Sequence, residues 1–310
     1  MSELGFDVGP LTIPLFIGTL INWALLGALV VQFYIYVIAF PKDARWMKLL
    51  VFLVFIVEIL QTLSDTRDTI RVFGAGWGNP SLLDEVGWAW FSVPVVGATT
   101  ACAGQIFFAW RVFILSRNWY MPTVITAITV FQLGAGIWSG ILIARAGRFS
   151  LLQFQSFKQP VAWLSATVLA DLTIVISTSY YLLKGNFGFH RATDQMILHI
   201  IKLTVETGGL CCVFAILDLA LFVKFQGNNF HLAVCIELSK IYSNSILLIL
   251  NSRANISHTN NTTLHQQPPS KGSEAVFEVH RGTVGSTITQ LTSVPQIDTD
   301  KYCCTLVFGM

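Results

Sequence analysis

The chain has 310 residues, of which 54% are hydrophobic and only 12% are charged, and its formal net charge is +2. Soluble domains carry about 25% charged residues, so a soluble globular protein this apolar could not cover its surface, whereas a polytopic membrane protein has this composition. The basic residues are scattered, which indicates no nucleic-acid-binding surface.

Seven apolar runs follow one another along the chain, each long enough, or nearly so, to cross about 30 Å of hydrocarbon as a helix. Backbone groups in lipid must be satisfied within helices or closed barrels, and these runs are too long for barrel strands. The sequence therefore predicts an all-α polytopic membrane protein, a bundle of seven transmembrane helices at residues 12–40, 47–64, 88–115, 119–143, 160–183, 200–223 and 231–250.

Polar segments separate the runs, and residues 65–87 are predicted to form a substantial extracellular loop. Within the fourth run, Gly136 and Gly140 have the spacing that lets two helices pack closely in lipid. Five tryptophans fall near predicted span ends, where an interfacial aromatic belt places them: Trp46, Trp88, Trp90, Trp119 and Trp163.

The orientation is predicted from the charges around the spans. The first residues carry Glu3 and Asp7 in place of a basic region, so the first helix is expected to remain as a signal anchor with the N-terminus outside. Cytosolic connections then hold eight Lys and Arg residues and outer ones six, which favours the same orientation and a cytosolic C-terminus. The expected location is the plasma membrane. The two sets are Lys42, Arg45, Lys48, Arg111, Arg117, Lys184, Arg191 and Arg253 against Arg67, Arg71, Arg145, Arg148, Lys158 and Lys224.

The apolar runs contain six ionisable residues, which are Glu58, Asp171, Glu206, Asp218, Glu237 and Lys240. Charges at membrane depth cost a few kcal/mol or more each, so they tend to face the bundle interior and to pair. At about 100° per residue, polar residues form one stripe on each of three spans: Glu237, Lys240, Ser243, Asn244 and Asn251 on the seventh, Glu58, Gln61, Thr62 and Asp65 on the second, and Thr167, Asp171 and Thr178 on the fifth.

The depth of these residues in the membrane limits which acids can pair with Lys240. At about 1.5 Å per residue, Lys240, Asp171 and Glu58 all lie near the midplane. Asp218 lies nearer the outer end, and Glu206 lies nearer the cytosolic end, one turn from Lys202. The sequence predicts that Asp171 or Glu58 neutralises Lys240. The pair could be a structural salt bridge or part of a core that binds a ligand or conducts protons, and a covalent chromophore on Lys240, as in rhodopsins, is a further alternative.

No other chemistry emerges from the residue pattern. The histidines are dispersed, the six cysteines have no metal-ligand spacing, and no Gly-rich phosphate loop or nucleophile context occurs. We therefore expect no enzyme activity, no cofactor and no metal. The expected partners are the lipid bilayer and either a small-molecule ligand or a cytosolic signalling partner.

Residues 254–310 differ sharply from the membrane domain, residues 1–253. They are rich in Ser, Thr, Asn, Gln and Pro, and such a segment buries too little apolar surface to offset chain entropy, so a disordered cytosolic tail is predicted. It contains glycosylation sequons at Asn255, Asn260 and Asn261. Cys303 and Cys304 are candidates for palmitoylation, against the simpler reading of unmodified cysteines.

Several stretches resemble a family of uncharacterised seven-helix membrane proteins of basidiomycete fungi, catalogued as a domain of unknown function. They are INWALLGALVVQFYIYVIAFPKDARWMKLLV at 21–51, FGAGWGNPSLLDEVGWAWFSVP at 73–94, FFAWRVFILSRN at 107–118, TDQMILHIIKLTVETG at 193–208, AILDL at 215–219 and LSKIYSNSILLILNSR at 238–253. The domain catalogued for this family resembles the later half of the membrane part, about residues 160–253. The resemblance implies that Glu206, Asp218 and Lys240 lie in recurring motifs, and it implies no activity; His199 stands where the family usually has arginine.

Three classes of function remain open. Seven spans, an outside N-terminus and a Ser- and Thr-rich tail favour a receptor-like sensor. Buried acids could instead serve a proton- or cation-coupled transporter or channel, although no internal repeat of the kind common in transporters is found. The third class is a structural membrane component without a ligand.

Overall fold

A computed structural model of the chain describes residues 9–76, 85–147, 158–184, 192–225 and 230–265. Among them are seven helices long and apolar enough to cross a membrane. The predicted all-α, seven-span membrane bundle is confirmed. The chain divides into two units, Met1–Asn255 and Ile256–Met310, and the seven spans belong to the first.

In the described part of the chain, the spans are built from nine helical elements. Two short π-helical segments adjoin the second and third spans: η1 follows α2, and η2 opens the third span before α4. Gly147, with φ 68°, ends α5 in the left-handed conformation that glycine adopts readily. The elements are α1 (Gly9–Ala39), α2 (Arg45–Ile70), η1 (Arg71–Ala75), η2 (Phe91–Val96), α4 (Gly97–Ser116), α5 (Tyr120–Ala146), α7 (Lys158–Lys184), α8 (Ala192–Lys224) and α9 (Phe230–His265).

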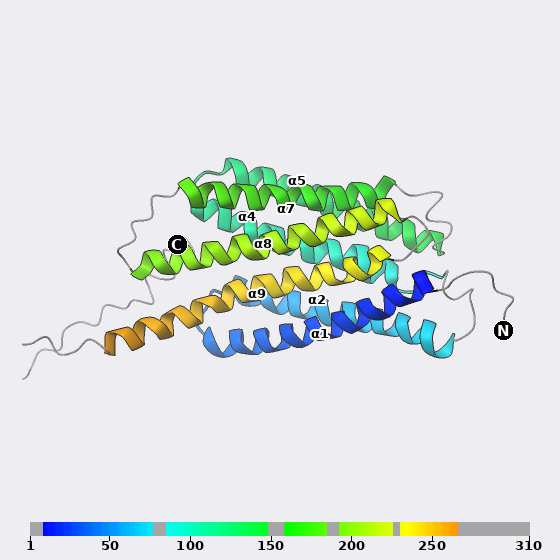
Figure 1. Cartoon of the computed structure of the whole chain (residues 1–310), viewed down its shortest axis with the longest axis horizontal. Coiled ribbons are helices and arrows are strands. Elements are labelled where there is room, and N and C mark those ends of the chain that lie inside the picture. Colours follow the sequence, from blue (N-terminus) through cyan, green and yellow to red (C-terminus); the bar gives the residue numbers. More distant parts are fainter. Residues whose placement is uncertain (1–8, 77–84, 148–157, 185–191, 226–229, 266–310) are drawn as a thin grey trace, which may run out of the picture. The chain divides into compact units, whose positions relative to one another are not determined.

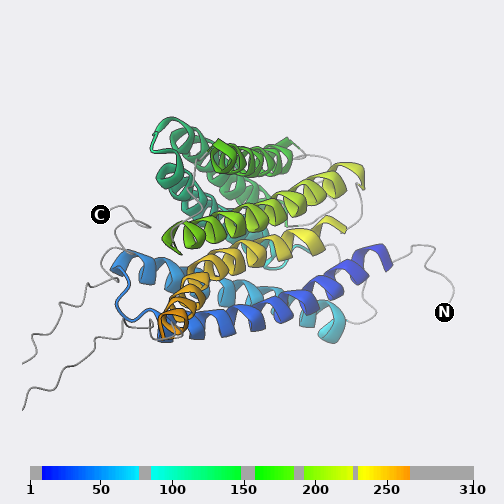
Figure 2. The same ribbon diagram turned by 60° about the vertical axis from the view of Figure 1, so that its left-hand side comes forward.

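Helix α9 lies in the middle of the bundle. Figures 1 and 2 both show it between α8 and the neighbouring pair α1 and α2, with α4, α5 and α7 grouped on the other side. In its apolar stretch 78% of the residues are buried, and in that of the third span 72%, against 28–50% in the other five. Polar residues on α9 therefore have protein on nearly every side.

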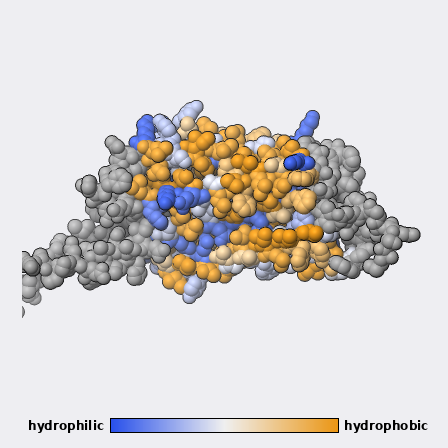
Figure 3. All heavy atoms as spheres, viewed as in Figure 1, coloured by the Kyte–Doolittle hydropathy of each residue, from blue (hydrophilic) through white to orange (hydrophobic). Residues whose placement is uncertain are grey.

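The outward faces of the bundle are apolar. Exposed large side chains include Leu183, Ile176 and Val213, and Figure 3 shows one face of the molecule coloured largely as hydrophobic. Soluble monomers rarely expose apolar patches of more than a few hundred Å², so these faces fit contact with lipid. Trp46, Trp88 and Trp119 are about half exposed or more, at 49%, 48% and 69%.

Two sequence-based expectations are corrected. Trp163 is buried in the core, only 6% exposed, and takes no part in an interfacial belt. The second span does not end at 64, because α2 and η1 carry the helix to Ala75 through residues expected in a loop. Asp65 and Asp68 are tolerated there since Asn22 Nδ2 and the Trp88 backbone N–H donate hydrogen bonds to them.

At the other end of the chain, α9 continues to His265, beyond the expected end of the membrane domain at residue 253. Residues 266–310, including Cys303 and Cys304, lie outside the described residues. Disorder of the tail therefore stays a prediction.

The small residues of α5 allow close helix packing, as predicted. A Cβ atom at Gly136 would lie 2.4 Å from Ala98 Cβ on α4, and one at Gly140 would lie 2.7 Å from Val95 Cγ2. Both distances are too short for van der Waals contact, so glycine is required where α5 crosses η2 and α4. By contrast, nothing lies within 4 Å of a Cβ placed at Gly134.

This difference gives a matched pair of substitutions on one helix. Gly136→Ala is expected to lower the free energy of unfolding by about 1–3 kcal/mol, because the added methyl group forces α5 away from α4. Gly134→Ala is expected to be neutral or slightly stabilising, since alanine has the higher helix propensity. Thermal unfolding in detergent measures both, and equal melting temperatures for the two variants would refute the close approach.

Candidate functional site

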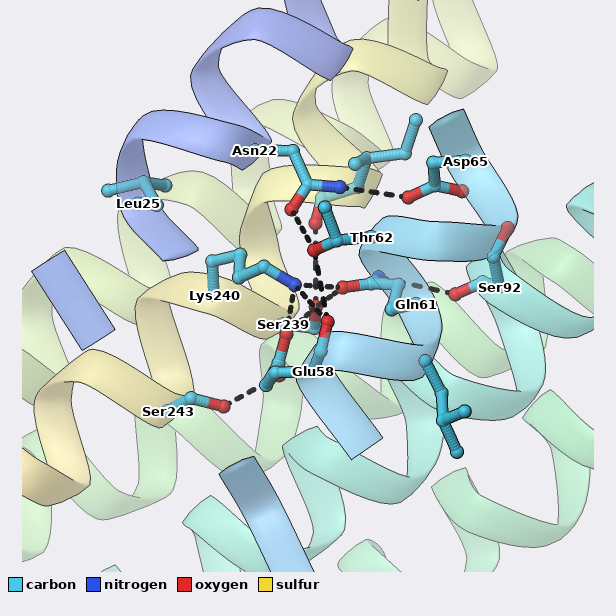
Figure 4. Close-up of polar contacts among 12 residues, drawn as sticks. Asn22, Leu25, Glu58, Gln61, Thr62, Asp65, Ser92, Ser239, Lys240 and Ser243 are labelled. Carbon is cyan, nitrogen blue, oxygen red and sulfur yellow. Dashed lines mark hydrogen bonds and ion pairs between the residues drawn. The ribbon is translucent and has the colours of Figure 1, made fainter. Parts of the chain in front are cut away.

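Lys240 is the centre of a buried polar cluster between α9 and α2. It lies near the middle of Phe230–Arg253, the membrane-spanning part of α9, with 0% of its surface exposed. Its ammonium group forms an ion pair with Glu58 Oε2 and donates hydrogen bonds to Gln61 Oε1 at 2.8 Å and to the Glu58 backbone oxygen at 3.1 Å. All three acceptors belong to α2 (Figure 4), so the charge is satisfied by a single neighbouring helix.

The Glu58 carboxylate is equally surrounded by donors. It is 0% exposed, and Ser243 donates to Oε1 at 2.6 Å while Ser239 lies 3.4 Å from Oε2, beside Lys240. Ser239, Lys240 and Ser243 recur at one helical turn on the α2-facing side of α9. A buried carboxylate is tolerated when it is paired and its remaining lone pairs are hydrogen-bonded, and both conditions hold here.

Hydrogen bonds extend the cluster to two further elements. Gln61 Nε2 donates to the Ser92 backbone oxygen of η2 at 3.2 Å. On the other side, Thr62 donates to Asn22 Oδ1 of α1 at 3.3 Å, and Asn22 Nδ2 donates to Asp65 Oδ2 at 3.0 Å. Figure 4 shows these contacts continuing from the ion pair in both directions. The cluster therefore connects α9 with α1, α2 and η2.

Asp171, the other predicted partner of Lys240, belongs to a separate cluster. The Tyr242 hydroxyl donates to its Oδ2 atom, and Gln105 Nε2 donates to Oδ1 at 3.0 Å. Tyr242 follows Lys240 by two residues, a rotation of about 200° around the helix, so the two side chains leave α9 on opposite sides. Of the two predicted acids, the structure pairs Lys240 with Glu58.

Two further predicted acids are buried without a nitrogen or oxygen hydrogen-bond donor among the described residues. Asp218 on α8 is 0% exposed and Glu237 on α9 is 4% exposed, and no N–H or O–H group donates to either carboxyl group. The Cys235 thiol lies beside Asp218, but a thiol is only a weak donor. Glu237 precedes Lys240 by three residues on the same helix and interacts electrostatically with its ammonium group.

The remaining predicted site residues lie outside the ion-pair cluster. The expectation that Glu206 belongs to the buried core is wrong, because its side chain is 58% exposed and pairs with Lys202 at 3.8 Å. Asn244 is half-buried and donates to the Leu25 backbone oxygen at 3.3 Å and to the Lys240 backbone oxygen at 2.8 Å. It thus fastens α9 to α1 without contacting a carboxylate.

A second ion pair was missed by the sequence analysis. Arg253 Nη2 lies 2.6 Å from Asp43 Oδ2 and Nη1 lies 3.3 Å from Oδ1, with both side chains 7% exposed. The Tyr36 hydroxyl donates to the same carboxylate at 3.0 Å, and the Phe40 ring lies under the guanidinium at 4.3 Å. Asp43 stands in a polar connection of the sequence, so hydropathy gave no signal that it is buried.

The described residues hold no group of three or more His, Cys, Asp or Glu side chains placed to bind a metal ion. Cys102, Cys211, Cys212 and Cys235 are free thiols within the bundle. The Lys240 amine is fully engaged by Glu58 and Gln61. The arrangement can therefore hold two helices together electrostatically, and it offers unpartnered carboxyl groups nearby.

Lys240→Met is expected to destabilise the protein by about 3–5 kcal/mol, because it leaves the Glu58 carboxylate buried and unpaired. Adding Glu58→Gln should restore part of that loss, since the two sites are coupled. Asp171→Asn is the matched control, and its effect should simply add to that of Lys240→Met. Thermal unfolding of the single and double variants in detergent measures the coupling, and rescue by Asp171→Asn in place of Glu58→Gln would contradict the pairing.

Comparison with protein families supports the earlier resemblance for the later part of the chain. Residues 167–255 match a family described as "Family of unknown function (DUF6534)". The match runs from α7 to α9 and includes Asp171, Asp218 and Lys240, whereas Glu58 lies outside it. No curated protein and no solved structure matches the chain. Together with the seven apolar helices, the match fits an integral membrane protein that crosses the bilayer several times.

Proposed function

We propose that this chain is a receptor-like seven-helix sensor in which the Lys240–Glu58 pair holds the resting arrangement of α9 against α2. The observation that carries the proposal is the closure of the pair: both side chains are 0% exposed, and the donors and acceptors around them come from the protein. A group that carries protons or cations across a membrane must exchange them with water. A closed pair instead suits a packing switch.

The second arrangement that a switch needs is available on α9 itself. Glu237 lies one helical turn from Lys240, and its carboxyl oxygens are buried without a donor. If α9 moved relative to α2, the ammonium group could exchange Glu58 for Glu237 without becoming unpaired. The lysine would be paired in both packings, so the two would have similar free energies. A ligand with different affinities for them could then shift their populations.

A transporter is the second candidate, and Asp218 is the observation that favours it. A carboxyl group with 0% exposure and only a thiol, a weak donor, beside it is unusual within a bilayer. Buried acids of this kind are typical of proton pathways. A structural membrane component is the third candidate. We further infer an orientation with the N-terminus outside, which the distribution of Lys and Arg supports, in the plasma membrane. We also infer a place in the basidiomycete family that the sequence resembles; the match of residues 167–255 to a family of unknown function supports the domain but not the organism.

Spin labels can follow the proposed switch. With the six native cysteines replaced, labels on Lys48→Cys of α2 and Leu248→Cys of α9 should give one distance in the parent protein. Glu58→Gln should populate a second distance, because Lys240 then turns to Glu237. Adding Glu237→Gln should abolish the second population and destabilise the protein. An unchanged distance in Glu58→Gln would contradict the switch.

Flux measurements separate the sensor from the transporter. Proteoliposomes with an internal pH-sensitive dye should show no proton flux above that of empty liposomes if the chain is a sensor. A flux that the parent protein supports and Asp218→Asn abolishes would establish the transporter instead. Lys202→Gln, which changes an exposed charge on the same helix, is the control.

The proposed orientation predicts the glycosylation state of the tail. With a cytosolic C-terminus, Asn255, Asn260 and Asn261 should carry no glycan after expression in a eukaryotic host. Treatment with an endoglycosidase should leave the electrophoretic mobility unchanged. A mobility shift that Asn260→Gln together with Asn261→Gln removes would place the tail outside and reverse the orientation of all seven spans.

A further inference from the structure

A cavity of about 400 Å³ lies at the end of the bundle where α2 passes into η1 and where α5 ends. This is the outer end in the orientation proposed above. Its volume lies within the range of about 300–1,000 Å³ typical of small-molecule sites. The lining combines one ion pair, an aromatic ring and small residues: Arg71, Glu85, Gly87, Trp90, Ala144 and Gly147.

Residues 86–88 form part of the cavity wall, and hydrogen bonds to other parts of the bundle hold them in place. The Trp88 backbone N–H donates to Asp68 Oδ2 at 2.6 Å, and the Val86 backbone N–H donates to the Gly147 backbone oxygen at 3.2 Å. Gly87 has φ 56°, and a Cβ there would lie 2.6 Å from Arg71 Nη2 and Asp68 Oδ1. Only glycine fits this turn, and the two hydrogen bonds fix the segment against α2 and α5.

Arg71 gives the cavity its chemical character. Its Nη1 atom donates to Glu85 Oε2 and its Nη2 atom to the Glu85 backbone oxygen, both at 2.9 Å. Its Nε atom is buried and has no acceptor. The Glu85 side chain is 48% exposed, and ion pairs this accessible to water contribute little, about 0–1 kcal/mol. A ligand carboxylate could therefore replace Glu85 and engage the guanidinium edge, which binds carboxylates in a bidentate manner.

We propose that this cavity binds a small organic acid, with its carboxylate on Arg71 and its apolar body against Trp90 and Ala144. The inference rests on the proposed sensor function, to which it adds the chemical class of the ligand. Trp90 belongs to the lining, and an indole offers a rigid apolar surface to a ligand. The small side chains of Ala144 and Ala146 and the Gly147 backbone leave the space for the ligand body.

The cavity is also connected to the buried ion pair. Trp90 is the residue directly before η2, and the Ser92 backbone oxygen within η2 accepts the hydrogen bond from Gln61 Nε2. The Gln61 side-chain oxygen in turn accepts a hydrogen bond from Lys240. π-Helical turns are frequent at functional sites. A ligand that moved Trp90 would thus displace η2, and Gln61 would transmit the displacement to Lys240.

Binding of named probes tests the ligand class. Hexanoate and benzoate are titrated against the full chain in nanodiscs, with hexanamide and benzamide as neutral controls, and the melting temperature and dissociation constant are measured. The acids should bind and raise the melting temperature, and the amides should not. Arg71→Gln should weaken the acids by about tenfold or more, since a hydrogen-bonded charge is lost. Ala144→Phe, which fills the cavity while leaving Arg71 in place, should abolish binding.

Arg67→Gln is the matched control, because Arg67 is 54% exposed, pairs with Asp68 and lies outside the cavity lining. It should bind the acids as the parent does. Equal binding of acids and amides, binding that survives Ala144→Phe, or no binding of either acid would overturn the proposed site. Acid binding that leaves the distance between labels on α2 and α9 unchanged would keep the site and refute the sensor function, so the two failures are distinguishable.

Discussion

The buried charge of Lys240 is the constraint on which the arrangement of this bundle depends. An ammonium group at the middle of a membrane-spanning helix costs several kcal/mol unless a counter-charge and acceptors surround it. Glu58 and Gln61 of α2 supply them, and Ser239 and Ser243 of α9 complete the shell of Glu58. Each charge is tolerable only because the other is present, so the rotation and depth of α2 and α9 relative to each other are set together.

Helix α9 connects the two sides of the bundle because its polar residues leave it in two directions. Lys240 faces α2, whereas Tyr242, two residues later, donates to Asp171 of α7 and lies beside Gln105 of α4. A Cβ at Gly104 would lie 2.9 Å from the Tyr242 ring, so a small residue on α4 makes room for the aromatic side chain. Apolar contacts between helices in a bilayer do little to fix the rotation of one helix against another, because lipid is equally apolar. These polar contacts and close approaches fix that rotation.

Hydropathy and helical periodicity predicted the seven spans and the polar stripes of the second, fifth and seventh, because both depend on local sequence alone. The sequence could not decide whether Glu58 or Asp171 pairs with Lys240, because the two acids lie at similar depth. The partner depends on the rotation of each helix about its axis, which is set by tertiary packing. Glu206 was assigned to the core because it lies in an apolar run, yet its side chain is exposed beside Lys202. The Asp43–Arg253 pair joins residues distant in sequence, and residues 65–75 form helix only because tertiary hydrogen bonds satisfy their polar groups.

The buried acids thus fall into two classes with different physical consequences. Glu58 is satisfied and stabilises one packing, whereas among the described residues Glu237 has no donor and Asp218 has only the weak thiol donor of Cys235. Because Glu237 lies within one turn of Lys240, an ion pair with Glu237 can offset the free energy lost when Lys240 leaves Glu58. The two packings then differ in free energy by only a few kcal/mol, and a ligand that binds one of them more tightly can shift the population between them. The connection from Trp90 through η2 and Gln61 reaches the ion pair directly. A small displacement at that end of the bundle would therefore act on the one interaction that the helix packing depends on.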